Sequence, residues 1–113
     1  MRLTAVQKEL VSIATGLIAL SVTVTALASE VVIVAQRDRQ FLTKTVDIKV
    51  SDIVRFTNED PFIHQLYTRS AEFAFSSDKQ PKGMILSVPF PVAGTFEVRC
   101  EIHPKMLLTV NVR

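Results

Sequence analysis

The stretch that decides how this chain is interpreted is Cys100-Glu101-Ile102-His103-Pro104-Lys105-Met106. It places a thiol, an imidazole and a thioether at three-residue intervals. Residues 95–100 and 107–112 on either side alternate apolar and polar side chains, which is typical of β-strands. The residues between them must therefore form a tight connecting loop. Three side chains on such a loop can converge on one metal ion without a long-range closure cost.

The composition of the chain narrows the choice of metal. Cys100 is the only cysteine, and His64 is the only histidine besides His103. A soft thiolate, imidazoles and a weak thioether suit an ion that cycles between Cu(II) and Cu(I). Structural zinc sites use cysteine and histidine rather than methionine, and iron–sulfur clusters need more cysteines. His64, Cys100, His103 and Met106 thus predict a single mononuclear copper ion in a trigonal His2Cys site with an axial methionine.

The N-terminus indicates export. Arg2 and Lys8 precede a run from Leu10 to Ala28 that contains no charged residue and ends in Ala26-Leu27-Ala28. A basic start, an apolar middle and a small-x-small end are typical of a secretory signal peptide. We predict a signal peptide at residues 1–28 and a domain at residues 29–113, in the periplasm or otherwise exported. An uncleaved membrane anchor is the alternative, because the run is about as long as the shortest membrane spans.

The remainder of the chain predicts one all-β domain. Short apolar or alternating runs are separated by turn residues, which indicates seven or eight strands in an antiparallel sandwich or barrel. Ser51-Asp52 has the character of a hairpin break, and the phenylalanines are expected to fill much of the core. The candidate strands are residues 31–35, 45–50, 53–57, 64–68, 72–75, 84–90, 95–100 and 107–112.

A family resemblance rests on Phe56-Thr57-Asn58, on His64, and on Gly94-Thr95-Phe96 leading into the Cys100-x-x-His103-x-x-Met106 loop. This pattern resembles the cupredoxin family of type 1 blue copper proteins and is most similar to its amicyanin- and plastocyanin-like members; the short loop itself is most similar to that of amicyanin, since plastocyanin has a longer gap before the methionine. The resemblance implies a Greek-key β-sandwich that shuttles single electrons. It further implies His64, Cys100 and His103 as equatorial copper ligands, Met106 as the axial ligand, and Asn58 as a supporting residue that hydrogen-bonds toward the Cys100 loop. Gln65, Ile102 and Lys105 depart from the family pattern.

The function predicted from these features is electron transfer rather than catalysis, because protein ligands take all four positions at the metal. The resemblance implies redox partners such as a c-type cytochrome or a periplasmic dehydrogenase, and we expect a monomer. Scattered, interleaved charges and a net charge of +2 argue against a nucleic-acid partner. Periplasmic copper carriage or storage without redox shuttling is the alternative function, and a metal-free secreted binding domain is a third. The carboxylates Glu59, Asp60, Glu97 and Glu101 are interpreted as solvated or turn residues.

Overall fold

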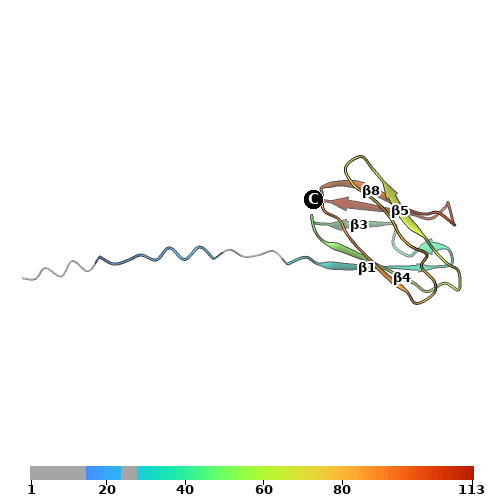
Figure 1. The fold of residues 1–113 in the computed structure, drawn as a ribbon, viewed down its shortest axis with the longest axis horizontal. Coiled ribbons are helices and arrows are strands. Elements are labelled where there is room, and N and C mark those ends of the chain that lie inside the picture. The colour runs from blue at the N-terminus through green and yellow to red at the C-terminus, as the bar shows by residue number, and fades with distance from the viewer. Residues whose placement is uncertain (1–14, 24–27) are drawn as a thin grey trace, which may run out of the picture.

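A computed structural model describes residues 15–23 and 28–113 of the chain. Most of the predicted signal peptide, residues 1–14 and 24–27, lies outside the described residues, and residues 15–23 form no strand or helix. None of the described residues lies in a helix that could cross a membrane. From residue 31 onward the chain forms nine strands in two packed sheets (Figure 1). The strands are β1 (Val31–Arg37), β2 (Gln40–Phe41), β3 (Thr45–Ile48), β4 (Ile53–Asn58), β5 (Leu66–Arg69), β6 (Ala74–Ser76), β7 (Ile85–Pro89), β8 (Gly94–Cys100) and β9 (Leu107–Val112).

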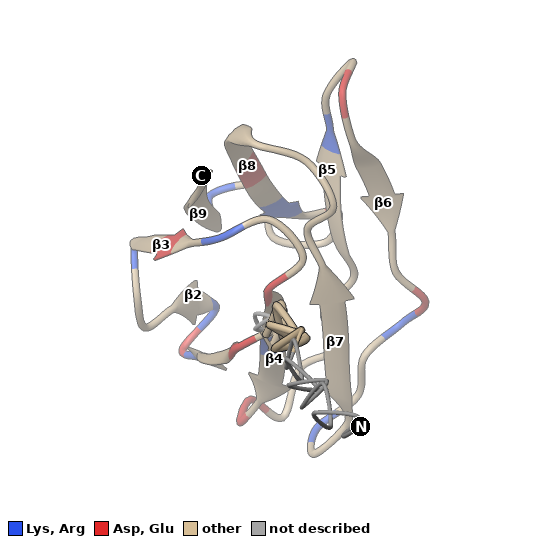
Figure 2. Cartoon of the chain, turned by 90° about the vertical axis from the view of Figure 1, so that its left-hand side faces the viewer, with Lys and Arg blue, Asp and Glu red and all other residues tan. Residues whose placement is uncertain are grey.

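The sheet topology confirms the all-β sandwich and corrects two details of the prediction. The sheets have the orders β2-β1-β4-β7 and β3-β9-β8-β5-β6, and Figure 2 shows them viewed from the end where the N-terminal segment leaves. The prediction of seven or eight strands omitted the two-residue strand β2. The prediction of purely antiparallel pairing was also wrong, because β1 pairs with β4 and β3 with β9 in parallel.

The parallel pairs arise where the chain changes sheet at residues 49–52. The sequence suggested a hairpin there, but β3 and β4 belong to different sheets, and Ser51 adopts a left-handed φ of 74° at the corner. A chain that crosses between sheets does not pair with the strand it has just left. Each strand instead pairs with a partner from elsewhere in the sequence, and the sandwich is closed by contacts between distant segments.

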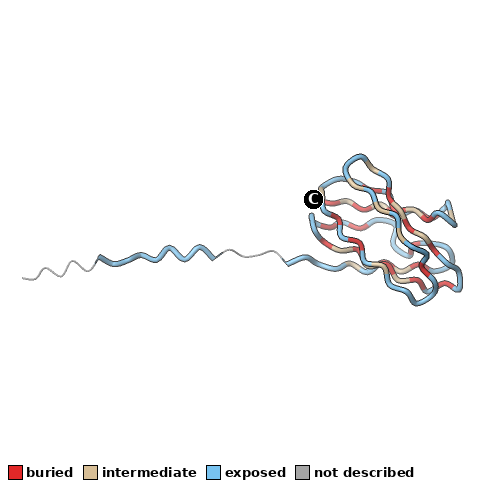
Figure 3. The backbone as a smooth tube through the Cα atoms, viewed as in Figure 1, coloured by how far each residue is buried: buried red, intermediate tan, exposed pale blue. Residues whose placement is uncertain are grey.

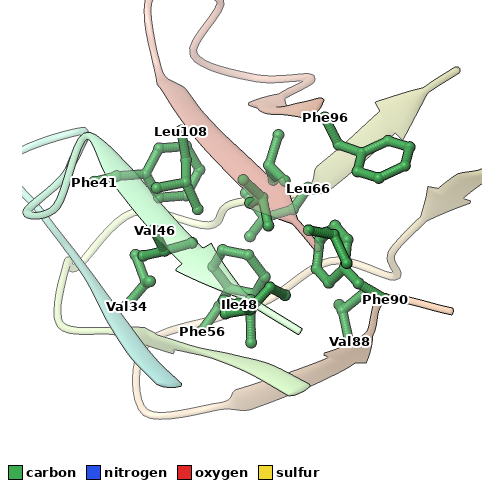
Figure 4. Close-up of a cluster of buried hydrophobic side chains, with 14 of the residues drawn as sticks. Val34, Phe41, Val46, Ile48, Phe56, Leu66, Val88, Phe90, Phe96 and Leu108 are labelled. Atoms are coloured by element: carbon green, nitrogen blue, oxygen red, sulfur yellow. The ribbon is translucent and has the colours of Figure 1, made fainter. Parts of the chain in front are cut away.

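The core lies between the two sheets, where the alternating side chains of both inner faces meet. Phe56, Phe90, Phe96 and Leu66 are fully buried in it (Figure 4). Burying a side chain of this size contributes roughly 1.5–3 kcal/mol relative to leaving it in water. Along the strands, buried and exposed residues alternate (Figure 3). The prediction that phenylalanines fill much of the core is confirmed.

The two ends of the sandwich differ in what they carry. We call the end where residue 30 enters β1 the N-terminal end, and the end that carries residues 101–106 the loop end. The chain leaves β8 at the loop end and returns along β9, so that the C-terminus lies at the N-terminal end (Figure 1). The parallel strands β1 and β4 both run from the N-terminal end to the loop end.

Candidate metal centre

The pairing of β5 with β8 brings the two parts of the predicted site together. Leu66 in β5 pairs with Cys100, the last residue of β8, so that His64 and Gln65 lie beside the start of the loop. The amide of Gln65 donates to Cys100 Sγ over 3.5 Å, and the amide of Glu101 donates to the Gln65 carbonyl over 2.8 Å. An amide hydrogen aimed at sulfur helps to orient the Cys100 side chain toward the position where a metal would bind.

Three donor atoms from His64, Cys100 and His103 converge at the loop end. Nδ1 of His64 lies 3.7 Å from Cys100 Sγ, and Nδ1 of His103 lies 3.8 Å from it. The two Nδ1 atoms are 3.2 Å apart. An ion with bonds of about 2.3 Å to sulfur and about 2.0 Å to each nitrogen produces separations of this size when the three donors surround it in a near-trigonal arrangement. The three side chains could therefore hold one metal ion.

His64 is held from both its ring and its backbone. The ring is completely buried, and its Nε2–H donates to Asp60 Oδ2 over 2.7 Å. Because a carboxylate only accepts, Nε2 carries the proton and Nδ1 keeps its lone pair for the metal position. The backbone of His64 pairs with Gln80 through hydrogen bonds of 2.7 and 3.1 Å. This second contact fixes the chain on which the ring is mounted.

Asp60 is a supporting residue that the sequence interpretation missed. It is buried, and its oxygens also accept from the amides of Asp38 at 2.6 Å and Arg39 at 3.1 Å. Burial raises the pKa of its carboxyl, but the hydrogen bonds from His64 and the two amides outweigh burial and hold the pKa below its usual value. Asp60 was interpreted as a solvated or turn carboxylate; it does lie in the turn after β4 but is buried rather than solvated, whereas Glu59 is exposed and pairs with Arg37. The only signal for Asp60 in the sequence is its place four residues before His64.

His103 is the donor residue nearest to solvent. It is half-buried, and its ring contacts His64 at a centroid distance of 4.9 Å and Phe62, edge-on, at 6.2 Å. Burial of the ring is the main cause that lowers the pKa of His103, and the neighbouring His64 and Arg39 lower it further. A lowered pKa keeps the imidazole neutral, which is the form that can bind a metal.

Met106 closes the loop. Its amide donates to the His103 carbonyl over 3.0 Å, and its side chain is buried. Pro104 fixes one backbone dihedral between these two residues and removes a backbone donor. The assignment of Met106 as the axial ligand stays a prediction, supported by its burial in the same tight loop.

A cluster of buried side-chain amides surrounds the residue whose backbone pairs with His64. Gln80 Nε2 donates to the carbonyls of Phe56 at 3.0 Å and Met84 at 2.7 Å, and Gln80 Oε1 accepts from Gln36 at 2.8 Å. No sequence pattern singled out Gln36 or Gln80, because a glutamine beside a turn is usually exposed.

Asn58 belongs to the same cluster, and its bonds differ from those predicted. Its side chain donates to the carbonyls of Phe62 and Gln80, both at 2.8 Å, and accepts from the amide of Asp60 at 2.8 Å. It was expected to hydrogen-bond toward the Cys100 loop. In the described structure its side-chain bonds instead shape the segment that leads to His64, since the turn at residues 59–63 folds back onto Asn58.

Comparisons with known proteins agree with this geometry. No protein-family model and no curated protein matches the sequence. Among solved structures, amicyanin from Paracoccus versutus (Thiobacillus versutus) superposes with a TM-score of 0.69 at 26% identity, covering 77% of this chain and 85% of that one. A reduced Cu(I) form of an amicyanin variant at pH 4 gives a TM-score of 0.68 at 26% identity, covering 77% and 86%. The oxidized state of another amicyanin variant gives 0.69 at 26% identity, with the same coverage. The chain therefore has the cupredoxin fold and resembles amicyanin.

Proposed function

We propose that this protein binds one copper ion in a type 1 site and carries single electrons between redox partners. The observation that carries the proposal is the convergence of two histidine Nδ1 atoms and one cysteine Sγ within 4.8 Å of one another. This donor set is the His2Cys set of blue copper sites, and Met106 in the same loop supplies the weak axial contact. The resemblance to amicyanin supports the same reading.

The donor chemistry fits copper better than zinc. A structural zinc site takes four cysteine or histidine ligands, and this chain has three such residues in the group. When bound, copper supplies a one-electron couple between Cu(II) and Cu(I). The protein's part is to hold the donors still. His64 is fixed through Asp60 and Gln80, and Cys100 is fixed by its place in β8. Fixed donors change little between oxidation states, and electron exchange then needs little rearrangement.

The burial of the donors favours electron transfer over copper delivery. His64 and Cys100 are almost entirely inaccessible to solvent, at 0% and 1% exposure. A carrier that hands over its ion needs these donors to become accessible, whereas an electron carrier needs only one ring near the surface. His103 is that ring, because it is the only donor of the group that is not fully buried.

The surface around His103 suits a brief encounter with another redox protein. Apolar side chains are exposed in the segments that border the loop end, and a small apolar contact favours weak, short-lived docking. These side chains are Phe62, Ile63, Met84, Ile102 and Leu107. A c-type cytochrome or a periplasmic dehydrogenase, partners implied by the resemblance, is the class of protein we propose here. Export to the periplasm is part of the proposal and is supported by the composition of residues 1–28.

The visible absorption and EPR spectra of the Cu(II)-loaded protein test the proposal. A thiolate in a trigonal site should give an intense visible sulfur-to-copper band and a narrow copper hyperfine splitting. A Cys100→Ser variant is the control and should lose the visible band. A weak, ordinary Cu(II) spectrum from the native protein would contradict the proposed site. Repeated oxidation and reduction then separates the two functions, because an electron carrier keeps its copper through many cycles and a delivery protein loses it.

A further inference from the structure

A groove runs along the loop end beside His103, and we infer that it docks an acidic segment of the partner protein. The inference rests on the proposed function in that the docked partner is the one that exchanges electrons at His103. It goes beyond that function because it assigns the charge of the partner's surface and the residues that select it.

The groove is formed by three loops, of which two are consecutive in the chain and the third is distant in sequence. The β1–β2 turn, the β2–β3 loop and the β8–β9 loop border a volume of about 870 Å³. A hydrogen bond of 3.0 Å from the amide of Thr109 to the Lys44 carbonyl joins the β2–β3 loop to β9. His103 lines the groove, so that any molecule bound there lies beside the ring through which we propose that electrons enter and leave. We call this ring the electron port.

The charges of the groove are mostly positive. Arg39, Lys44 and Lys105 line it, one from each segment, and Asp38 is the only carboxylate among the lining residues. All three cations are exposed. Three exposed positive charges spread along an open groove are complementary to an extended stretch that carries several carboxylates.

These cations also differ from three arginines elsewhere on the surface. Arg37, Arg69 and Arg99 each pair with a glutamate. Within the described part of the chain, no such ion pair involves Arg39, Lys44 or Lys105. A partner carboxylate can therefore pair with a groove cation without first displacing an internal carboxylate, and this lowers the desolvation and rearrangement that docking costs.

Arg39 is placed by an unusual backbone turn. Asp38 and Arg39 both have φ of 56°, a left-handed conformation that glycine normally takes. The turn is held by Asp60, which accepts from both amides, so the Arg39 guanidinium does not take part in that bonding. It lies instead 3.9 Å from the ring centroid of Phe62, and the Phe62 ring contacts the His103 ring in an edge arrangement. Asp60 thus fixes a cation at the rim of the electron port and orients His64 at the same time.

Binding of a hexaglutamate peptide to the ¹⁵N-labelled protein, followed by amide NMR shifts at low ionic strength, tests the inference. We expect saturable shifts at residues 38–45 and 102–106 in both the Cu(I)-loaded and the metal-free protein. Arg39→Glu, Lys44→Glu and Lys105→Glu should each weaken binding about three- to tenfold, because attraction becomes repulsion at an exposed site. Lys49→Glu, which makes the same change in net charge at the N-terminal end, is the matched control and should leave binding unchanged.

Two results would overturn the inference. One is equal weakening by the Lys49 variant, which would mean that the peptide senses only net charge. The other is that inorganic phosphate at the same charge concentration gives the same shifts, which would make the groove a site for small anions. The peptide titration can be carried out on the metal-free protein. Its result therefore stays interpretable even if the spectra show that the protein is not a type 1 copper electron carrier.

Electron exchange provides an independent readout. The Cu(I) protein can be oxidised by hexacyanoferrate(III), an anion, and by tris(phenanthroline)cobalt(III), a cation. Reversing Arg39 or Lys105 should slow the reaction with the anion and speed the reaction with the cation, by about three- to tenfold at low ionic strength, and added salt should erase the difference. Equal effects on the two oxidants would place electron exchange away from the groove.

Discussion

At each end of the β1–β4 pair a buried aspartate accepts hydrogen bonds from backbone amides, but the two aspartates serve different purposes. At the N-terminal end Asp52, just before β4, accepts from the amides of Glu30 at 2.9 Å and Lys49 at 2.8 Å. At the loop end Asp60, just after β4, accepts from the amides of Asp38 and Arg39. Both aspartates are buried, and each ties one end of β1 to the neighbouring chain.

The two aspartates differ in one hydrogen-bond partner. Asp60 also accepts from His64, whereas the hydrogen bonds found for Asp52 involve backbone amides alone. A carboxylate that only closes a strand contributes to stability. The same carboxylate with an imidazole attached also decides which ring nitrogen is protonated and where the ring points. The loop end therefore couples the stability of the sandwich to the position of a metal ligand, whereas the N-terminal end does not.

The largest expected effect comes from removing the thiolate. At free copper a thousand times the dissociation constant, binding should add about 4 kcal/mol to the free energy of unfolding of the native protein. Cys100→Ala should lose nearly all of that gain, and Asp52→Asn should keep it. Thermal unfolding with and without copper measures the gain in each variant. An undiminished gain in Cys100→Ala would show that the ion binds elsewhere.

The next effect separates the two aspartates. Asp60→Asn should lower the unfolding free energy of the metal-free protein by about 1–2 kcal/mol and weaken copper binding about tenfold to a hundredfold. Asp52→Asn should also lower stability but leave copper affinity unchanged. Urea unfolding and competition with a copper chelator measure the two quantities. If both variants weakened copper binding equally, the coupling would not be specific to the loop end.

A smaller effect on copper affinity is expected from the amide cluster around Gln80. Gln80→Leu leaves the carbonyls of Phe56 and Met84 without their donor and should cost about 1–3 kcal/mol of stability. Copper affinity should fall by less than in Asp60→Asn, because the backbone bridge between residues 64 and 80 does not depend on the side chain. The same urea and chelator measurements apply. A larger loss of affinity in Gln80→Leu would place the main support of His64 in the amide cluster.

The smallest effect is a dependence on pH. Hydrogen bonds from the amides of Glu30 and Lys49 lower the pKa of Asp52, and the pKa of Asp60 is also lowered. The unfolded chain then binds more protons than the folded one as the pH falls below about 4, so acid should destabilise the metal-free protein. Either Asp→Asn variant should show a shallower loss of stability between pH 6 and pH 3. Urea unfolding in which the variants and the native protein lose stability in parallel across this range would contradict this assignment.

The sequence predicted the half of the site that is local. Cys100, His103 and Met106 are neighbours on one loop, and His64 followed because the chain has no other histidine to pair with His103. Asp60 could not be recognised, because its burial depends on a turn 22 residues away that folds over it. The parallel pairing of β1 with β4 and of β3 with β9 escaped for the same reason, since alternation within a strand carries no information about its distant neighbour.

The position where residue 30 enters β1 has a practical consequence. It lies at the opposite end of the sandwich from His103, about 20 Å away if measured by the length of a seven-residue strand. A fusion partner or a gold electrode attached ahead of β1 would leave the His103 face turned outward into solution. Voltammetry of such a film would therefore report electron exchange through the full depth of the domain, whereas attachment through a cysteine placed at Lys105 would report the short route.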